Sequence, residues 1–302
     1  MKKSLRVLVY GGTGAQGSSV VRALLEKGHE PFILSRNGNK AAELVSAGAK
    51  VIIGDTSELD TLVAASRGMD AISLMTPLFT NVPPALSARN GIEAARQAGV
   101  RHIVWNTSAQ PAPAPTGNPL VDHQPATTRL LEKSGLSYVT LIPTIFAENL
   151  LGPYTAPFVA TQNKLTYPTP AAMSIQWTPM IDLGRLVVAA LERPELSGMT
   201  YRIASTERLN GPQLAAAFSQ GVGRMVTYEE MAPEAFGKIL NEAFGPGAGD
   251  AIAADYQRYH EDPSLWDTWW VDTDAMSKDL GITTTPMMTW VTEYAAMFSD
   301  RG

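Results

Sequence analysis

Glycines cluster between an apolar run and an amphipathic segment near the start of the chain. The cluster follows the apolar run 7–10 and reads Gly11-Gly12-Thr13-Gly14-Ala15-Gln16-Gly17. A strand that ends in glycines and turns at once into a helix places unpaired backbone N–H groups around a pyrophosphate, with the positive end of the helix dipole behind them. A glycine-rich turn that binds nothing is the alternative. The helical spacing of apolar residues over 20–25 completes the order strand, loop, helix, and this order favours a dinucleotide site.

The end of the next apolar run indicates which dinucleotide binds. A carboxylate at this point binds the ribose 2′-hydroxyl of NAD, whereas a cation accommodates the additional phosphate of NADP. The segment 31–37 carries Arg36, and the first acid after it is Glu43, inside a helical pattern over 38–47. We therefore expect NADP(H) as the cofactor, with Asn37 and Lys40 able to assist. A solvated arginine at a strand end is the alternative.

Composition narrows the class of protein. The chain has 302 residues, of which 45% are hydrophobic and 18% charged, enough for one large core and a smaller one. A net charge of −5 offers no basic face, so we expect neither nucleic acid nor a membrane as partner. No apolar run approaches the length of a membrane span and no signal segment opens the chain, so a cytoplasmic location is expected.

Several kinds of catalytic site are disfavoured by residue type. The chain has no cysteine, which excludes disulfides and thiolate chemistry. Its four histidines show no metal-ligand spacing, and no Gly-x-Ser-x-Gly elbow occurs. We expect neither a metal site nor a serine hydrolase.

Strand and helix patterns alternate through the first half of the chain. The alternation predicts a doubly wound parallel sheet of the Rossmann type, an α/β fold, over residues 1–146. Buried strands are expected at 5–10, 31–35, 50–53, 70–75, 101–106 and 137–142, and helices at 15–28, 38–47, 58–67, 83–98 and 124–134.

Ligands of such sheets bind at the carboxyl ends of the strands. The residues at these ends are therefore candidates for ligand contact; they are Asp55, Thr56, Thr76, Pro77, Thr107, Ser108, Pro143 and Phe146. Asp55 could instead cap the following helix, and the two roles can coexist.

The regular alternation stops after residue 146. Proline and glycine become frequent, and tryptophans stand among short helical stretches at 182–192, 211–221 and 232–244. We expect residues 147–302 to form a smaller α+β part that covers the substrate and is partly interleaved with the first. The proline-rich segment 109–119 borders the site as a mobile lid or a rigid connector.

Taken together, these motifs resemble the NmrA-like group of atypical short-chain dehydrogenase/reductases, which includes quinone reductases, triphenylmethane reductases, isoflavone-reductase-like enzymes and redox-sensing regulators. The resemblance covers nearly the whole chain. It depends on 11–17, Arg36, Gly54-Asp55, Thr107-Ser108-Ala109, 134–143, 146–150, 177–182 and Trp290. Membership implies NAD(P)H binding across the sheet, with the nicotinamide near Ser108 and Pro143 and the substrate under the C-terminal part.

The chain departs from the wider superfamily at its catalytic pair. No Tyr-x-x-x-Lys occurs, and the resemblance places His123 at the tyrosine position and Thr127 at the lysine position. His123 could donate a proton near neutral pH, or could be a loop or capping residue without chemistry. Ser108 could contact the substrate or polarise a carbonyl.

Two functions of different class fit these residues. The first is an NADPH-dependent reductase of an aromatic or conjugated small molecule (a quinone, enone, imine or dye), held near Phe146, Trp177 and Trp266, although these aromatics could instead anchor a core. The alternative is an NADP(H)-sensing regulatory protein that binds a protein partner without catalysis. An epimerase or dehydratase is disfavoured by Arg36 and by the missing tyrosine. A monomer or a homodimer is expected.

Overall fold

Two compact units make up the computed structural model, which describes residues 4–38, 40–76, 81–111, 114–117 and 119–300. The first unit comprises Met1–Pro143, Met180–Ile203 and Asp274–Thr283, and the second comprises Thr144–Pro179, Ala204–Thr273 and Thr284–Gly302. The domain division at residue 146 stays a prediction. Residues 180–203, which the sequence analysis assigned to the later part, belong to the first unit.

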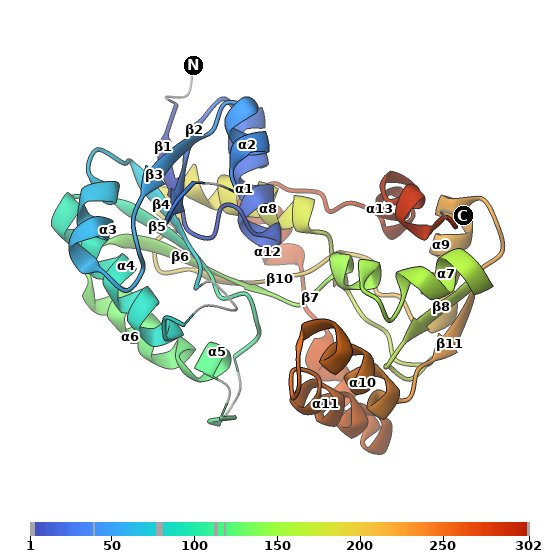
Figure 1. Cartoon of the computed structure of the whole chain (residues 1–302). Helices are drawn as coiled ribbons and strands as arrows, with labels where there is room; N and C mark the ends of the chain where they lie inside the picture. Colours follow the sequence, from blue (N-terminus) through green and yellow to red (C-terminus); the bar gives the residue numbers. More distant parts are fainter. Residues whose placement is uncertain (1–3, 39, 77–80, 112–113, 118, 301–302) are drawn as a thin grey trace. The chain divides into compact units, whose positions relative to one another are not determined.

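A seven-stranded parallel sheet organises the first unit (Figure 1). Its strand order is β10-β6-β5-β4-β1-β2-β3, and the predicted Rossmann-type fold is confirmed. The strands are β1 (Arg6–Val9), β2 (Glu30–Ser35), β3 (Lys50–Ile53), β4 (Ala71–Leu74), β5 (His102–Asn106), β6 (Ser137–Pro143) and β10 (Thr200–Ile203). The six predicted strands are present, and β10 adds a seventh strand that the sequence analysis did not predict.

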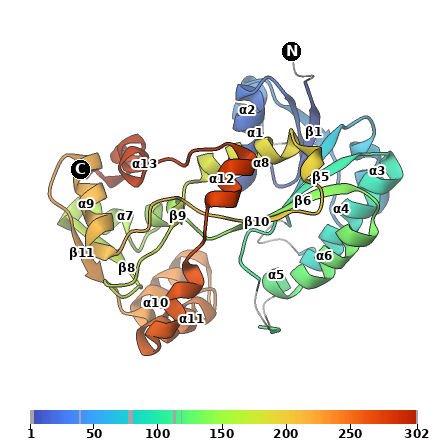
Figure 2. The same ribbon diagram turned by 180° about the vertical axis from the view of Figure 1, so that it is seen from behind.

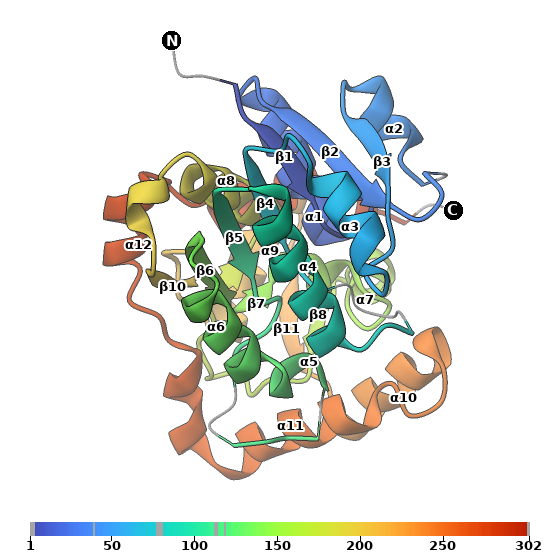
Figure 3. The ribbon, with the colours of Figure 1, turned by 90° about the vertical axis from the view of Figure 1, so that its left-hand side faces the viewer.

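Helices cover both faces of this sheet (Figure 3). On one face lie α1 (Ala15–Glu26), α8 (Met180–Leu191) and α12 (Asp274–Leu280), with α2 (Ala42–Ser46) beside α1; on the other lie α3 (Leu59–Ser66), α4 (Pro84–Ala98) and α6 (Gln124–Lys133), with α5 (Pro119–Asp122) next to α4 and α6. Because both faces are covered, the central strands are buried, and Val7, Leu8 and Val9 have no exposed surface. The edge strands β3 and β10 are partly exposed, so the expectation of a buried strand at 50–53 is wrong.

The strand order reverses beside β1. Strand β1 pairs with β2 on one side and with β4 on the other, so the connections that leave β1 and β4 run to opposite faces of the sheet. Such a reversal opens a crevice at the carboxyl ends of the two strands, where ligands of open α/β sheets bind. The glycine cluster lies directly after β1 and therefore at this crevice.

The second unit is built from short helices and strands (Figure 2). Its hydrophobic core is rich in aromatic side chains. Two pairs of parallel strands, β7 (Ile145–Phe146) with β9 (Trp177–Thr178) and β8 (Lys164–Tyr167) with β11 (Thr227–Glu230), accompany the helices. Its α-helices are α7 (Ala156–Gln162), α9 (Gly211–Val222), α10 (Pro233–Phe244), α11 (Asp250–Glu261) and α13 (Met287–Glu293), and 3₁₀ turns are η1 (Ala147–Leu151), η3 (Pro263–Trp269) and η4 (Ala295–Phe298). The predicted helices 211–221 and 232–244 are α9 and α10, and the predicted 182–192 is α8 of the first unit.

Two features that would indicate a function are absent from the described residues: a membrane-spanning helix and a cluster of metal ligands. Among the described helices, none is long and apolar enough to cross a membrane. The described residues also contain no group of three or more His, Asp or Glu side chains that could hold a metal ion.

Candidate functional site

The glycine cluster forms a tight turn between β1 and α1. Gly11 has a φ of +64°, which favours glycine, and the Gly14 N–H donates to the Gly11 carbonyl at 2.9 Å. A Cβ on Gly17 would overlap the Gly11 carbonyl, so glycine at position 17 lets the first turn of α1 lie directly on the loop. Gly17 therefore allows the close contact between α1 and the loop. The close contact between α1 and α8 depends on Gly184 instead, because a Cβ added there would overlap the Ser19 carbonyl.

This turn fits the pyrophosphate of a dinucleotide. Helix α1 begins at Ala15, and the backbone N–H groups of its first turn have no partner within the helix. No acidic residue lies in that turn, and Gly14 and Ala15 are exposed, so an anion can approach the positive end of the helix.

Arg36 stands at the carboxyl end of β2 with an exposed side chain. Within the described residues it forms no hydrogen bond and no ion pair, so its guanidinium is available to a ligand phosphate. Glu43, the nearest acid in the following helix, pairs with Arg22 at 2.7 Å. The site therefore has an unengaged cation at the position where the sequence analysis expects the ribose 2′ substituent to be bound.

Asp55 closes a turn after β3. Its Oδ1 accepts from the Ser57 N–H at 2.8 Å and from the Ser57 hydroxyl at 2.7 Å. These bonds, with a smaller contribution from the nearby charge of Arg36, hold the pKa of Asp55 below its ordinary value. Helix α3 begins at Leu59 with Glu58 at its N-cap, so the alternative role of Asp55 as the cap of that helix is wrong.

Three threonines among the candidates are partly or fully enclosed. The Thr56 carbonyl accepts from Asn90 Nδ2 at 3.0 Å. The buried Thr107 donates its hydroxyl proton to the Ala109 carbonyl at 2.7 Å, so this hydroxyl is engaged within the protein. Thr76 is buried at the end of β4.

The remaining strand-end candidates divide between the units. Pro143 is buried at the end of β6 in the first unit. Phe146 is buried in β7 of the second unit, and Pro77 lies outside the described residues.

Ser108 belongs to a hydrogen-bond network that joins β5 to α1. Its hydroxyl donates to Gln16 Oε1 at 3.1 Å, and its backbone N–H donates to Asn106 Oδ1 at 3.0 Å. Asn106 Nδ2 donates to the same Gln16 oxygen at 2.7 Å. Ser108 has a φ of +61°, a conformation unusual for a residue with a side chain. Asn106 was missed by sequence reasoning; its signal is an amide that ends the otherwise apolar strand 102–106 directly before the candidate Ser108.

His123 is buried and hydrogen-bonded on both sides of its ring. Thr127 Oγ1 lies 3.0 Å from Nδ1 and 3.2 Å from the His123 carbonyl oxygen, to which it can donate its proton. Thr76 Oγ1 lies 3.4 Å from Nε2, which makes that hydrogen bond weak. Burial lowers the pKa of His123 below 6.5, so the imidazole is neutral at pH 7. At the position predicted for a catalytic residue, His123 thus contacts Thr127 and Thr76. A neutral imidazole does not favour the predicted role as a proton donor.

The tryptophans proposed for substrate contact lie among the aromatic residues of the second unit. Trp177 is almost fully buried, and its ring meets Tyr167 edge to face at a centroid distance of 5.0 Å. The indole N–H of Trp266 donates to the Tyr259 carbonyl at 2.8 Å. These contacts favour the alternative in which both residues anchor a core.

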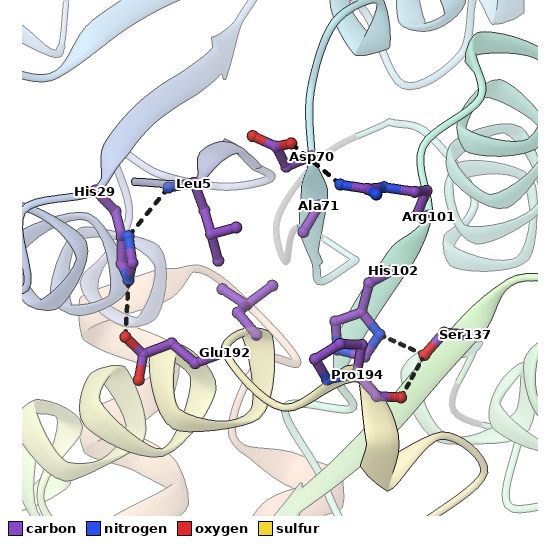
Figure 4. Close-up of a pocket in the computed structure, with 10 residues that line it drawn as sticks. Leu5, His29, Asp70, Ala71, Arg101, His102, Ser137, Glu192 and Pro194 are labelled. Carbon is purple, nitrogen blue, oxygen red and sulfur yellow. Dashed lines mark hydrogen bonds and ion pairs between the residues drawn. The ribbon is translucent and has the colours of Figure 1, made fainter. Parts of the chain in front are cut away.

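A cavity of about 550 Å³ lies at the opposite ends of the strands of the first unit (Figure 4). Its polar groups satisfy one another: His29 lies 3.1 Å from Glu192, Arg101 lies 3.5 Å from Asp70, and His102 lies 2.8 Å from Ser137. The lining comes from the residues that begin β4, β5 and β6, hence from the amino edge of the sheet. None of the predicted site residues lines it, so it is separate from the candidate site.

Comparisons with known proteins agree with this geometry. A family model described as the NmrA-like family matches residues 2–269. An NAD(P)H azoreductase of Xenophilus azovorans is 31% identical over 265 residues, which cover 82% of this chain and 89% of that protein.

Solved structures show the same fold. The NADPH-dependent quinone oxidoreductase of Escherichia coli in complex with NADPH has a TM-score of 0.76 at 23% identity, covering 95% of this chain and 99% of that chain. The negative transcriptional regulator Nmra in complex with NAD has a TM-score of 0.74 at 16% identity, covering 98% and 97%.

Proposed function

Because this chain belongs to the NmrA-like family, we propose that it is an NADPH-dependent reductase of an aromatic or conjugated small molecule: a quinone, an enone, an imine or a dye. The observation that carries the proposal is the pairing of the glycine turn at the switch point with the unengaged Arg36 at the end of β2. The 31% identity to an NAD(P)H azoreductase, over most of both chains, supports a reductase of conjugated molecules.

The residues of the first unit divide the binding of NADPH between them. The first-turn N–H groups of α1 bind the pyrophosphate, and Arg36 binds the 2′-phosphate. NADPH, when bound, supplies the hydride. The chain contributes position, since holding the hydride donor against an electrophilic carbon or nitrogen removes most of the entropic barrier to transfer.

The missing Tyr-x-x-x-Lys pair favours substrates that need no proton from the protein. The nearest replacement, His123, is buried and its pKa is lowered, so it is poorly suited to protonate a product at pH 7. Reduced quinones and dyes can take their proton from water. We therefore assign His123 to holding Thr76 and α6 in place.

The test uses the purified full chain and a panel of quinones, enones, imines, azo dyes and triphenylmethane dyes. The loss of NADPH absorbance is followed with each acceptor, with NADH in place of NADPH as the comparison. We expect turnover with at least one acceptor and a preference for NADPH. Rates equal to those without protein for every acceptor would reject the reductase.

The second candidate, an NADP(H)-sensing regulator, is favoured by the neutral, buried His123 in place of a catalytic tyrosine. Such a protein must bind its partner with different affinity in the free and the nucleotide-bound state. Affinity capture of partners with and without NADPH separates the two functions. If the same amount of partner is captured with and without NADPH, the result counts against the regulator.

A further inference from the structure

Gln16, Asn106 and Ser108 are joined by three hydrogen bonds, and the donor of each can be determined. The backbone N–H of Ser108 can only donate, so the Asn106 atom that it meets is Oδ1. Asn106 therefore turns Nδ2 toward Gln16, and the Gln16 atom that receives this bond is Oε1. Because Oε1 can only accept, the Ser108 hydroxyl donates its proton to Gln16.

As a consequence, the Ser108 hydroxyl can offer a ligand only the lone pairs of its oxygen, as a hydrogen-bond acceptor. A hydroxyl has one proton, and here Gln16 receives it. Ser108 Oγ can accept a hydrogen bond from a ligand N–H or O–H, but it cannot polarise a carbonyl unless the bond to Gln16 breaks. The network also holds Ser108 at its positive φ, because both its N–H and its hydroxyl are bound.

Strand order indicates which part of NADPH comes to Ser108. Arg36 ends β2 on one side of β1, and the pyrophosphate turn follows β1 itself. With the 2′-phosphate on the β2 side, the nicotinamide half must extend across β1 toward β4 and β5, and Ser108 follows β5. The nicotinamide half carries donors, the carboxamide N–H and the ribose hydroxyls.

We infer that Gln16 is a positioning residue that fixes Ser108 Oγ as a hydrogen-bond acceptor for the nicotinamide half of NADPH. The inference rests on the proposed function in that it requires NADPH binding, but it does not require turnover. It gives the glycine turn a second role, since Gln16 links the phosphate-binding helix α1 to the residue after β5.

The experiment is calorimetric titration of the full chain with NADPH and with 2′,5′-ADP, which carries the 2′-phosphate but no nicotinamide. For Ser108→Ala and for Gln16→Leu we expect the Kd of NADPH to rise about five- to tenfold, the loss of roughly one hydrogen bond. The Kd of 2′,5′-ADP should stay within about twofold, since that ligand does not reach Ser108. Ser18→Ala removes a hydroxyl from the same helix outside the network and should leave the ratio of the two Kd values unchanged.

Two comparisons separate positioning from a merely structural effect. The double variant Gln16→Leu with Ser108→Ala should bind NADPH no more weakly than the weaker single variant, because one residue acts through the other. Gln16→Glu keeps an oxygen for Asn106 and Ser108, so its charge should weaken both ligands while their Kd ratio stays that of the wild type. Multiplying effects in the double variant, or a Glu variant that changes the ratio as Leu does, would overturn the inference.

The outcomes also distinguish this inference from the reductase. A wild-type chain that binds neither ligand overturns both. A chain that shows the expected ratios but reduces no acceptor supports the positioning role of Gln16 and rejects the reductase.

Discussion

At the scale of single residues, the site combines one unengaged cation with polar groups that are already paired. Arg36 has no ion pair within the described residues, whereas Thr107, Ser108 and His123 each have hydrogen bonds inside the protein. Under the proposed function, the charge of Arg36 sets the choice of cofactor, and the neutral, hydrogen-bonded groups set the geometry near the nicotinamide.

Replacing Arg36 tests the cofactor preference. In Arg36→Ala, we expect the KM for NADPH to rise about tenfold or more, because a charge-assisted hydrogen bond to phosphate is lost. The KM for NADH should change less than about twofold, since NADH has no 2′-phosphate. Steady-state kinetics with both cofactors measure the difference. Arg96→Ala removes an equal charge from the last turn of α4, where Arg96 pairs with Glu93, and should change neither. Equal losses for NADPH and NADH in Arg36→Ala would contradict the assignment.

The backbone of Ser108 makes a separate prediction about stability. Ser108→Gly and Ser108→Ala both remove the hydroxyl, but only alanine keeps a Cβ at a φ of +61°. We expect the glycine variant to have the higher free energy of unfolding, by about 1 kcal/mol. Chemical denaturation of the two variants side by side measures this. An alanine variant at least as stable as the glycine variant would show that the backbone relaxes at this position.

At the scale of elements, helix α1 is held between two close backbone contacts. Its first turn lies on the Gly11 carbonyl through Gly17, and its Ser19 carbonyl meets α8 at Gly184. Neither contact leaves room for a Cβ, so helix α1 can move little relative to β1 or to α8. A rigid helix terminus keeps the N–H groups of its first turn, which we propose bind the pyrophosphate, in one orientation.

Alanine at the two positions separates binding from packing. Gly17→Ala should lower the free energy of unfolding by about 1 to 3 kcal/mol, as overpacking does, and should also weaken NADPH binding, because the loop and α1 must separate. Gly184→Ala should lower stability by a similar amount with a smaller effect on the Kd of NADPH. Denaturation and calorimetry on both variants measure these effects. If Gly17→Ala binds NADPH like the wild type, the turn does not hold the pyrophosphate.

At the scale of the whole molecule, two of the three buried histidines of the first unit, His102 and His123, make it sensitive to mild acid. Burial lowers the pKa of both His102 and His123 below 6.5, the value expected in the unfolded chain. The unfolded chain therefore binds more protons than the folded one as the pH falls through about 6.5. The stability that the two neutral histidines contribute is therefore fully present above about pH 6.5 and is lost progressively as the pH falls below it.

A pH series measures this loss. Between pH 7.5 and pH 5.5, we expect the free energy of unfolding to fall, by at most about 1.4 kcal/mol per pH unit for each histidine. The carboxyl groups of Asp55, Glu93 and Asp122, whose pKa values are lowered from 3.8 or 4.5, act at lower pH and do not account for a change in this window. His123→Gln should make the dependence shallower. A stability that is constant or rises toward pH 5.5 would contradict the neutral, buried state.

Much of the first unit could be predicted because its signals are local. The six strands predicted between residues 5 and 142 are each marked by a short apolar run, and the glycines at 11–17 mark the turn that follows the first of them. The seventh strand, β10, has an alternating pattern of exposed and buried residues over four positions, which is weak by itself, and it becomes a strand by pairing with β6. In the second unit, strands of two to four residues form by pairing with distant segments, such as Ile145 with Trp177, and leave no periodicity to read.

The sequence by itself determined the sheet type, the place of the glycine turn between β1 and α1, and a cation at the end of the second strand, because each depends on residues close together in the chain. Only the tertiary structure showed that Gln16 and Asn106 are hydrogen-bonded to Ser108, that burial lowers the pKa of His123, and that residues 180–203 belong to the first unit. These properties depend on atoms brought together from distant positions, where burial and hydrogen-bond geometry, rather than residue type, determine charge and proton direction.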